Sequence, residues 1–364
     1  MISSLANYYA EQEEIEVIIG VLDKNPSFYR LHPNVELLNL YELHQSKNIW
    51  QSIKNTIIII IRTRQAFKDW CPDYVICFSI KQLVFALVAK SFLKIKIIGS
   101  ERNNPNHYHD PFWNSMKKVA TPFADGFIFQ TEGAREYYPQ RVQQKSAVIP
   151  NGILVDNFPT TILPPSERIP GSICAVGRLH EQKDYHTLIN AFAVFVQTHP
   201  LYSLTIYGEG IERERLEQLI KKLKLEDKVI LAGRIQNVIQ EISKRKIYVL
   251  SSKFEGMPNT LMEGMACGCA CISTDCNYGP RDLIVDGENG ILVPVGDIDA
   301  MAAAMHKLAS NKELLNKISY NASNIRNTHS MDGIGERYLE FLTKTSAPGN
   351  KSDKVRKDCV KRHN

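Results

Sequence analysis

The strongest constraint on the fold is a regular alternation of short apolar segments with longer helical ones. Apolar segments of this length, rich in β-branched and aromatic residues, are typical of buried strands, and intervening helices indicate βαβ units. In the first half of the chain the candidate strands lie at 15–22, 74–78, 96–99, 126–130 and 147–150. Because βαβ units build mostly parallel sheets, the pattern predicts an α/β protein.

The second half of the chain repeats this pattern. Its candidate helices lie at 185–196, 212–223, 238–244 and 259–267, between the strand-type segments SICAVG, SLTIYG, KVILAG, IYVLSS and ACISTD. Between the two halves, residues 157–171 contain four prolines, a composition that excludes a helix or a central strand. We therefore expect two Rossmann-like domains, at 1–156 and 172–345, joined by a linker at 157–171.

The overall composition agrees with a two-domain globular protein. A chain of 364 residues exceeds the roughly 100–150 residues of a common single domain, and 44% hydrophobic with 23% charged residues excludes a disordered chain. No secretory leader precedes the eight cysteines, and no apolar run approaches the ~20 residues of a membrane span. We expect a cytoplasmic protein with reduced thiols. The tail at 346–364, with six basic and two acidic residues, is expected to be disordered.

Two long stretches without acidic residues, 43–68 and 74–100, combine lysine and arginine with apolar side chains. This composition suits an anionic membrane surface, although solvated helix faces have it as well. Trp113, Lys117 and Lys118 on a candidate amphipathic helix add to the first interpretation. We expect peripheral attachment to the inner face of the cell membrane. Nucleic-acid binding has little support, because no nucleic-acid-binding motif accompanies the basic residues.

The residues that follow the strands of the second half are the best candidates for a binding site. Parallel sheets bind ligands at the carboxyl ends of their strands, and here these ends are rich in glycine, basic residues and carboxylates. Arg178 and Lys183 suit a diphosphate. The helix that begins near Asn259 would direct its free N–H groups at the same anion.

These segments, above all EGMPNTLMEGMACGCACISTDCNYGPRDLIVDGENGILVPVGD, resemble the retaining glycosyltransferases of family 4. That family has the GT-B architecture, in which two Rossmann-like domains face each other across a cleft. The resemblance covers residues 172–300 closely and most of the remaining chain loosely. Its most specific element is the pair of glutamates eight residues apart, Glu255 and Glu263.

The resemblance implies roles for individual residues. Glu255 would hold hydroxyls of the donor sugar, Glu263 would hold the ribose of the nucleotide, and Arg178 and Lys183 would stabilise the departing diphosphate. We expect Glu255, Arg178 and Lys183 to be the catalytic residues. Donor-binding roles are implied for Glu263, Gly177, Gly208, Arg234, Gly256, Met257, Asn259, Thr260 and Leu261.

The resemblance implies no metal and no cofactor besides the donor. Asp297-Ile298-Asp299 spells the DxD metal motif of another transferase architecture, but it precedes an Ala/Met-rich stretch and indicates a helix start. Cys267, Cys269 and Cys271 lack the paired spacing of a zinc site.

The segment IGSERNNP at 98–105 resembles a subgroup that elongates lipid-linked or surface-polysaccharide glycans in bacteria. This resemblance implies that Glu101, Arg102 and Asn103 lie near the acceptor; a salt-bridged loop is the alternative. His107 and His109 are either a proton relay for the acceptor hydroxyl or solvated loop residues.

One departure from the family concerns the start of the chain. Family members begin with a strand and a Gly-Gly loop, followed by a helix similar to residues 2–12, whereas this sequence begins at that helix. We therefore expect the first strand of the N-terminal sheet to be missing; either Met1 is not the natural start or the chain is a shortened copy.

The principal hypothesis is a retaining, metal-independent glycosyltransferase. It would move a hexose or N-acetylhexosamine from a UDP- or GDP-sugar to a lipid-linked or surface-polysaccharide glycan. The alternatives are a nucleotide-sugar epimerase of similar architecture and an inactive, shortened transferase that binds a partner protein or a nucleotide sugar.

Overall fold

A computed structural model describes the chain except residues 23–29, 42–47, 103, 106–110 and 346–364. The expected disordered tail therefore lies outside the described residues. The chain forms two compact units, one made of residues 1–152 together with those from 331 onward, and one made of residues 153–330. Within the described ranges, no helix combines the length and apolarity that crossing a membrane requires.

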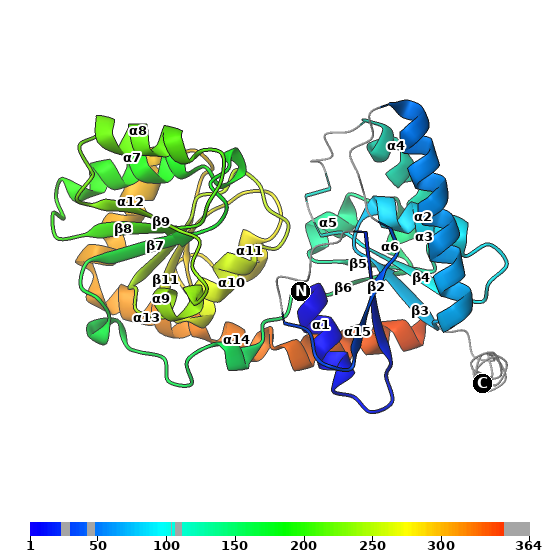
Figure 1. Ribbon diagram of the computed structural model, residues 1–364. Helices are drawn as coiled ribbons and strands as arrows, with labels where there is room; N and C mark the ends of the chain where they lie inside the picture. Colours follow the sequence, from blue (N-terminus) through cyan, green and yellow to red (C-terminus); the bar gives the residue numbers. More distant parts are fainter. Residues whose placement is uncertain (23–29, 42–47, 103, 106–110, 346–364) are drawn as a thin grey trace. The chain divides into compact units, whose positions relative to one another are not determined.

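The first unit contains two parallel sheets (Figure 1). Their orders are β1-β2 and β3-β4-β5-β6, and the strands are β1 (Val17–Val21), β2 (Val35–Asn39), β3 (Tyr74–Cys77), β4 (Lys96–Ser100), β5 (Gly126–Phe129) and β6 (Ser146–Val148). The helices are α1 (Ile2–Ala10), α2 (Ile49–Trp70), α3 (Ile80–Ala89), α4 (Pro111–Ala120), α5 (Glu132–Glu136), α6 (Gln140–Gln143) and α15 (Met331–Lys344). Among the described residues β1 pairs with β2 alone and β3 pairs with β4 alone, so the two sheets are separate.

The second unit is a six-stranded parallel sheet with helices on both faces. Its order is β12-β11-β10-β7-β8-β9, and the strands are β7 (Ser172–Val176), β8 (Ser203–Tyr207), β9 (Val229–Gly233), β10 (Ile247–Leu250), β11 (Ala270–Thr274) and β12 (Ile291–Val293). The helices are α7 (Tyr185–Val196), α8 (Arg213–Lys222), α9 (Val238–Ser243), α10 (Asn259–Ala266), α11 (Pro280–Leu283), α12 (Ile298–Ser310), α13 (Lys312–Ser323) and α14 (Ile325–Thr328). This is the Rossmann strand order. The chain adds β8 and β9 on one side of β7, and then β10, β11 and β12 on its other side.

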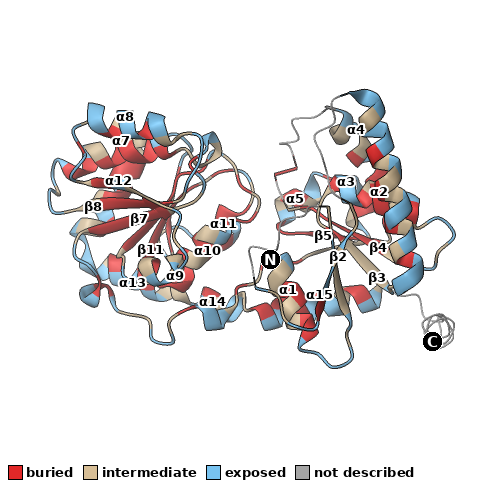
Figure 2. Ribbon diagram, in the orientation of Figure 1, coloured by how far each residue is buried: buried red, intermediate tan, exposed pale blue. Residues whose placement is uncertain are grey.

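The sheet of the second unit is buried on both faces, as Figure 2 shows. Helices α7, α8 and α12 cover one face, and α9 and α10 cover the other. Strands covered on both faces are apolar almost throughout, which explains why they are recognisable as short continuous apolar segments in the sequence. The core therefore fixes the strand ends from which the candidate site is built.

Two boundaries differ from the sequence-based expectation. Helix α15 packs on α1 in the first unit, where the Tyr9 hydroxyl donates to the carbonyl oxygen of Gly335 at 2.9 Å, so residues 331–344 do not continue the second unit. The expected linker is part of the second unit. Its Arg168 is buried and donates to the carbonyl oxygens of Leu163 and Cys267.

We predict that Gly264→Ala destabilises the second unit. Glycine at this position lets α10 approach β10 so closely that an added Cβ would lie 2.5 Å from the Cγ atom of Tyr248. Overpacking of this kind typically lowers the free energy of unfolding by about 1–3 kcal/mol, which denaturant titration would measure. Alanine has a higher helix propensity than glycine, so without this close packing the substitution would leave the free energy of unfolding unchanged or raise it. Either result would contradict the packing.

Candidate active site

The site lies where β7 and β10 are neighbours, at the point where the strand order of the sheet changes direction. The loop after β7 contains Gln182, and the loop after β10 contains Lys253 and Phe254. The Lys253 backbone N–H donates to the Gln182 carbonyl at 2.8 Å, and the Gln182 side chain donates to the Phe254 carbonyl at 3.0 Å. These bonds join the two segments that carry the expected catalytic residues. Parallel sheets bind their ligands at such a switch point.

The centre of the site is an ion pair between Lys183 and Glu255. The Lys183 Nζ lies 2.7 Å from Oε1 of Glu255, and the two side chains are only 14% and 9% exposed. The Ser252 hydroxyl donates to the same carboxylate oxygen at 2.7 Å, and the Ser251 hydroxyl donates to the Lys183 backbone carbonyl at 2.6 Å. The ammonium group is thus held in one position with little water around it.

Two glycines allow the strand ends to meet. The backbone of Gly208 lies against the Gly177 carbonyl so closely that an added Cβ would be 1.9 Å from that oxygen. A Cβ on Gly177 would lie 2.9 Å from Cε of Lys183. The Gly208 N–H donates to the carbonyl of Gly233, next to Arg234. Only glycine lets these three strand ends approach one another without displacing Lys183.

Helix α10 brings the second glutamate of the motif. Glu263 is half-buried, and burial raises the pKa of its carboxyl group to about 7, while the charge of Lys183 acts in the opposite direction. Asn259, Thr260 and Leu261 form the first turn of the same helix, and Pro258 separates this turn from Gly256 and Met257. The first turn of α10 follows the loop of Glu255, as the sequence predicts.

The side chains of Arg178 and Arg234 are both exposed at strand ends of the second unit. Arg178 follows β7, and Arg234 follows β9. The structure therefore brings all the expected catalytic and donor-binding residues to the carboxyl edge of one sheet. Their functional roles stay predictions.

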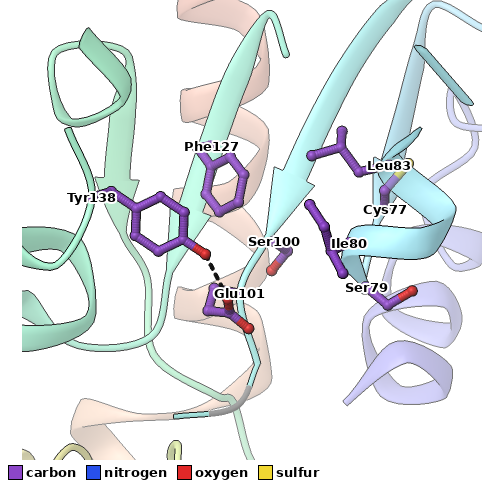
Figure 3. Close-up of a pocket in the computed structure, with 8 residues that line it drawn as sticks. All are labelled: Cys77, Ser79, Ile80, Leu83, Ser100, Glu101, Phe127 and Tyr138. Carbon is purple, nitrogen blue, oxygen red and sulfur yellow. Dashed lines mark hydrogen bonds between the residues drawn. The ribbon is translucent and has the colours of Figure 1, made fainter. Parts of the chain in front are cut away.

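The expected acceptor-side residues lie in the first unit. Glu101 follows β4, and its Oε2 accepts a hydrogen bond from the Tyr138 hydroxyl at 2.5 Å and lies 3.3 Å from Nζ of Lys117. Figure 3 shows Glu101 and Tyr138 at a small pocket that Ser100 and Phe127 also line. Lys117 is buried beside this carboxylate, so it does not belong to a solvent-facing basic surface as the sequence interpretation assumes.

Arg102 is engaged inside the first unit. Its guanidinium group donates to the Asn151 side chain at 2.8 Å and to the Tyr338 hydroxyl at 2.5 Å, and it lies over the ring of Phe78. These contacts fasten α15 to the end of β4. Asn103, and His107 with His109, lie outside the described residues.

The two sequence features that resemble metal sites have local structural roles. Asp297 caps α12, because its Oδ1 accepts a hydrogen bond from the Ala300 N–H at 2.9 Å, and the expected helix start is confirmed. Cys267, Cys269 and Cys271 are buried free thiols. Across the described part of the chain, no group of three or more His, Cys, Asp or Glu residues is arranged to hold a metal ion.

Comparisons with known proteins identify the family of this chain. Residues 167–325 match the family model described as glycosyl transferases group 1. The lipopolysaccharide 1,6-galactosyltransferase of Salmonella typhimurium is 31% identical over 257 residues, which are 68% of this chain and 68% of that protein. The chain belongs to the group 1 glycosyltransferases.

Two further similarities extend over nearly the whole chain. An N-acetyl-D-galactosaminyltransferase of Campylobacter jejuni, named for a GalNAc-containing undecaprenol diphosphate glycan, is 25% identical over 93% of this chain and 92% of that protein. The structure of Anabaena HepE in complex with UDP and glucose has a TM-score of 0.77 at 18% identity, covering 93% and 95% of the two chains. The structural likeness supports a GT-B fold for this glycosyltransferase.

Sequence reasoning missed one buried side chain at the site of this glycosyltransferase, Tyr185. The residue is 4% exposed. Its buried hydroxyl has no hydrogen-bond partner among the described residues and would lie 2.8 Å from a Cβ on Gly177. Burial raises the pKa of Tyr185 well above its ordinary value, so the hydroxyl stays protonated. A tyrosine two residues after Lys183, at the first position of α7, is the signal that marks it.

We predict that the ligand-free protein loses stability as the pH rises from about 4.5 to about 7. The folded state holds the proton of Glu263 more tightly than the unfolded chain, where the pKa is 4.5, so the contribution of Glu263 to the free energy of unfolding is largest below this window and is lost as the pH rises through it. The loss amounts to about 3 kcal/mol. Glu263→Gln resembles the protonated form, and its free energy of unfolding should fall less between pH 5 and pH 8. Equal slopes in the two proteins would contradict the raised pKa.

Proposed function

We propose that the chain is a retaining, metal-independent glycosyltransferase of family 4. It moves a hexose or N-acetylhexosamine from a UDP- or GDP-sugar to a hydroxyl group of a lipid-linked or surface-polysaccharide glycan. The observation that carries the proposal is the buried Lys183–Glu255 pair at the switch point of the sheet. The relatives that act on undecaprenol-linked and lipopolysaccharide glycans support the choice of acceptor.

In this proposal the donor diphosphate lies between Lys183, Arg178 and the first turn of α10. Free N–H groups at a helix start favour an anion, and two side-chain cations add to that field. Glu255 accepts hydrogen bonds from hydroxyl groups of the donor sugar, and Glu263 accepts them from the ribose. Gly177, Gly208, Gly256 and Met257 allow the backbone to lie against the phosphates and the sugar, and Arg234 lies toward the base.

The proposed reaction breaks the bond between C1 of the sugar and the diphosphate oxygen. The acceptor oxygen forms its bond to C1 on the same face, and the acceptor proton passes to an oxygen of the leaving diphosphate. Negative charge develops on that diphosphate, and Lys183 already faces it. A charged group that needs no rearrangement during the reaction stabilises the transition state more than the ground state. In this mechanism Lys183 and Arg178 supply the positive charge without a divalent ion.

On the acceptor side we propose that the glycan lies against the end of β4, near Glu101, Arg102 and Asn103. Glu101 itself is buried and held by Tyr138 and Lys117, as in the salt-bridged alternative, so in this proposal its carboxylate fixes the end of β4 rather than contacting the glycan. A lipid-linked acceptor places the protein at the inner face of the cell membrane, as a peripheral protein.

We predict that Glu255→Ala lowers sugar transfer at least 100-fold, because the variant loses its contact to the sugar and leaves Lys183 without its partner. The assay is nucleotide release from a panel of UDP- and GDP-sugars, with and without extracted lipid-linked acceptor and with a chelator present. The control is Glu181→Ala, which removes an exposed glutamate that pairs with Lys253 at 2.9 Å, and should retain activity within about twofold.

Each other outcome of this assay would contradict one part of the proposal. Full activity of Glu255→Ala would overturn the assigned site, and loss of activity with chelator would overturn metal independence. Interconversion of sugars without acceptor would indicate an epimerase. Donor binding without any release would indicate an inactive transferase.

We predict that Tyr185→Phe weakens binding of the donor nucleotide diphosphate about tenfold while the melting temperature stays close to that of the wild type. The hydroxyl is buried beside Lys183 with no hydrogen-bond partner in the described structure, and a hydrogen bond to a charged group contributes about 1.5–3 kcal/mol. Calorimetry with UDP and GDP measures the change. Tyr202→Phe, on a ring that packs against Phe195, is the matched control. Unchanged affinity in Tyr185→Phe would show that this hydroxyl does not reach the phosphates.

A further inference from the structure

Helix α2 has an apolar stripe on the side that faces away from its own unit. Its inner side is buried at every fourth residue, at Asn55, Ile59, Thr63 and Phe67. On the other side Trp50, Ile53, Ile57 and Ile61 recur every three or four residues and are between 46% and 77% exposed. Since residues two apart on a helix point about 200° away from each other, Ile57 faces away from the side that Ile59 buries.

The same surface continues onto the loop after α3. Nη1 of Arg64 donates to the backbone carbonyls of Ala89 and Ser91, at 2.8 Å each, and these bonds hold the loop beside α2. The next residue is Phe92, whose side chain is fully exposed. We name these five exposed residues the outer stripe: Trp50, Ile53, Ile57, Ile61 and Phe92.

Such a stripe is unusual on a helix at the surface of a water-soluble unit. The solvent side of an amphipathic helix is normally polar, and a contiguous apolar patch marks a surface that contacts something else. Figure 2 shows the many exposed residues of α2 on the side away from the sheet. The stripe therefore calls for an apolar partner.

The charges beside the outer stripe indicate which partner. Lys54 and Lys68 are exposed on α2, and Lys94 is exposed two residues after Phe92; Arg62, exposed as well, donates to the Leu40 carbonyl oxygen at 3.3 Å. The acidic residue of the helix is Asp69 at its C-terminal end, where it accepts a hydrogen bond from Gln65. Apolar side chains flanked by long cationic ones match a lipid surface, because the apolar groups enter the acyl boundary while the cations stay among anionic headgroups.

We propose that the outer stripe and its flanking cations dock α2 in the plane of an anionic lipid bilayer. The helix is about 33 Å long, so lying flat it places the whole stripe at one depth. The inference deepens the proposed function. It rests on that function in one respect, since a lipid-linked acceptor is what brings the protein to a membrane. Vesicle binding needs neither donor nor turnover, so it is tested separately from sugar transfer.

The experiment compares the full chain with three double variants by co-sedimentation with vesicles of equimolar phosphatidylglycerol and phosphatidylcholine, and of phosphatidylcholine alone. Ile57→Glu with Ile61→Glu should lower binding to the anionic vesicles at least tenfold. Leu201→Glu with Ile211→Glu changes two exposed apolar residues of the second unit in the same way and should bind within about twofold of the wild type. Lys54→Gln with Lys68→Gln should weaken binding severalfold and reduce its dependence on salt.

Three results would overturn the proposal. The wild type does not bind the anionic vesicles, the Ile57→Glu with Ile61→Glu variant binds as well as the wild type, or the control Leu201→Glu with Ile211→Glu loses as much binding as that variant. If instead the wild type is a dimer by light scattering and Ile57→Glu makes it a monomer, the stripe is covered by a second copy of the chain. Transfer to a soluble acceptor analogue, measured on the same variants, separates loss of docking from loss of catalysis.

Discussion

The buried ion pair between Lys183 and Glu255 is the interaction on which the geometry of the second unit is centred. It forms because β7 and β10 are neighbours although three helices and two strands separate them in the chain. Gly177 and Gly208 leave room for the lysine, and Ser252 supplies a second hydrogen bond to the carboxylate. Burying two charges is unfavourable in itself, so these added contacts compensate part of the lost hydration. A ligand with its own negative charge would complete this compensation.

Much of the second unit could be predicted from the sequence because its strands are buried on both faces and are therefore apolar throughout. The helix at 185–196 is found with the predicted bounds, and the pair Glu255 and Glu263 lies on the predicted loop and helix. Strands β2 and β12 are not predicted from the sequence, for different reasons. The exposed residues of β2 include acidic and polar ones, and β12 has three residues, too few to show a period.

Long-range contacts explain what the sequence does not reveal. Nothing local to residues 331–344 shows that Tyr9 and Arg102 will bind them, because these partners lie more than two hundred residues away. Arg168 is a similar case, since its hydrogen bonds fix a proline-rich segment that composition alone describes as a linker. Tyr185 looks like an ordinary core residue until its hydroxyl is seen to lie beside Gly177.

Helix α2 shows why composition and structure answer different questions about a surface. The stretch 43–68 has isoleucines and cations and no acidic residue, which fits both a membrane surface and a solvated helix. The structure shows where these side chains lie. Ile59 and Phe67 are buried in the first unit, whereas Ile57 and Ile61 are exposed on the outer side with Lys54. If α2 only covered the sheet, polar residues would serve on its outer side equally well. A second apolar stripe has a physical role only when a second apolar phase or partner meets it.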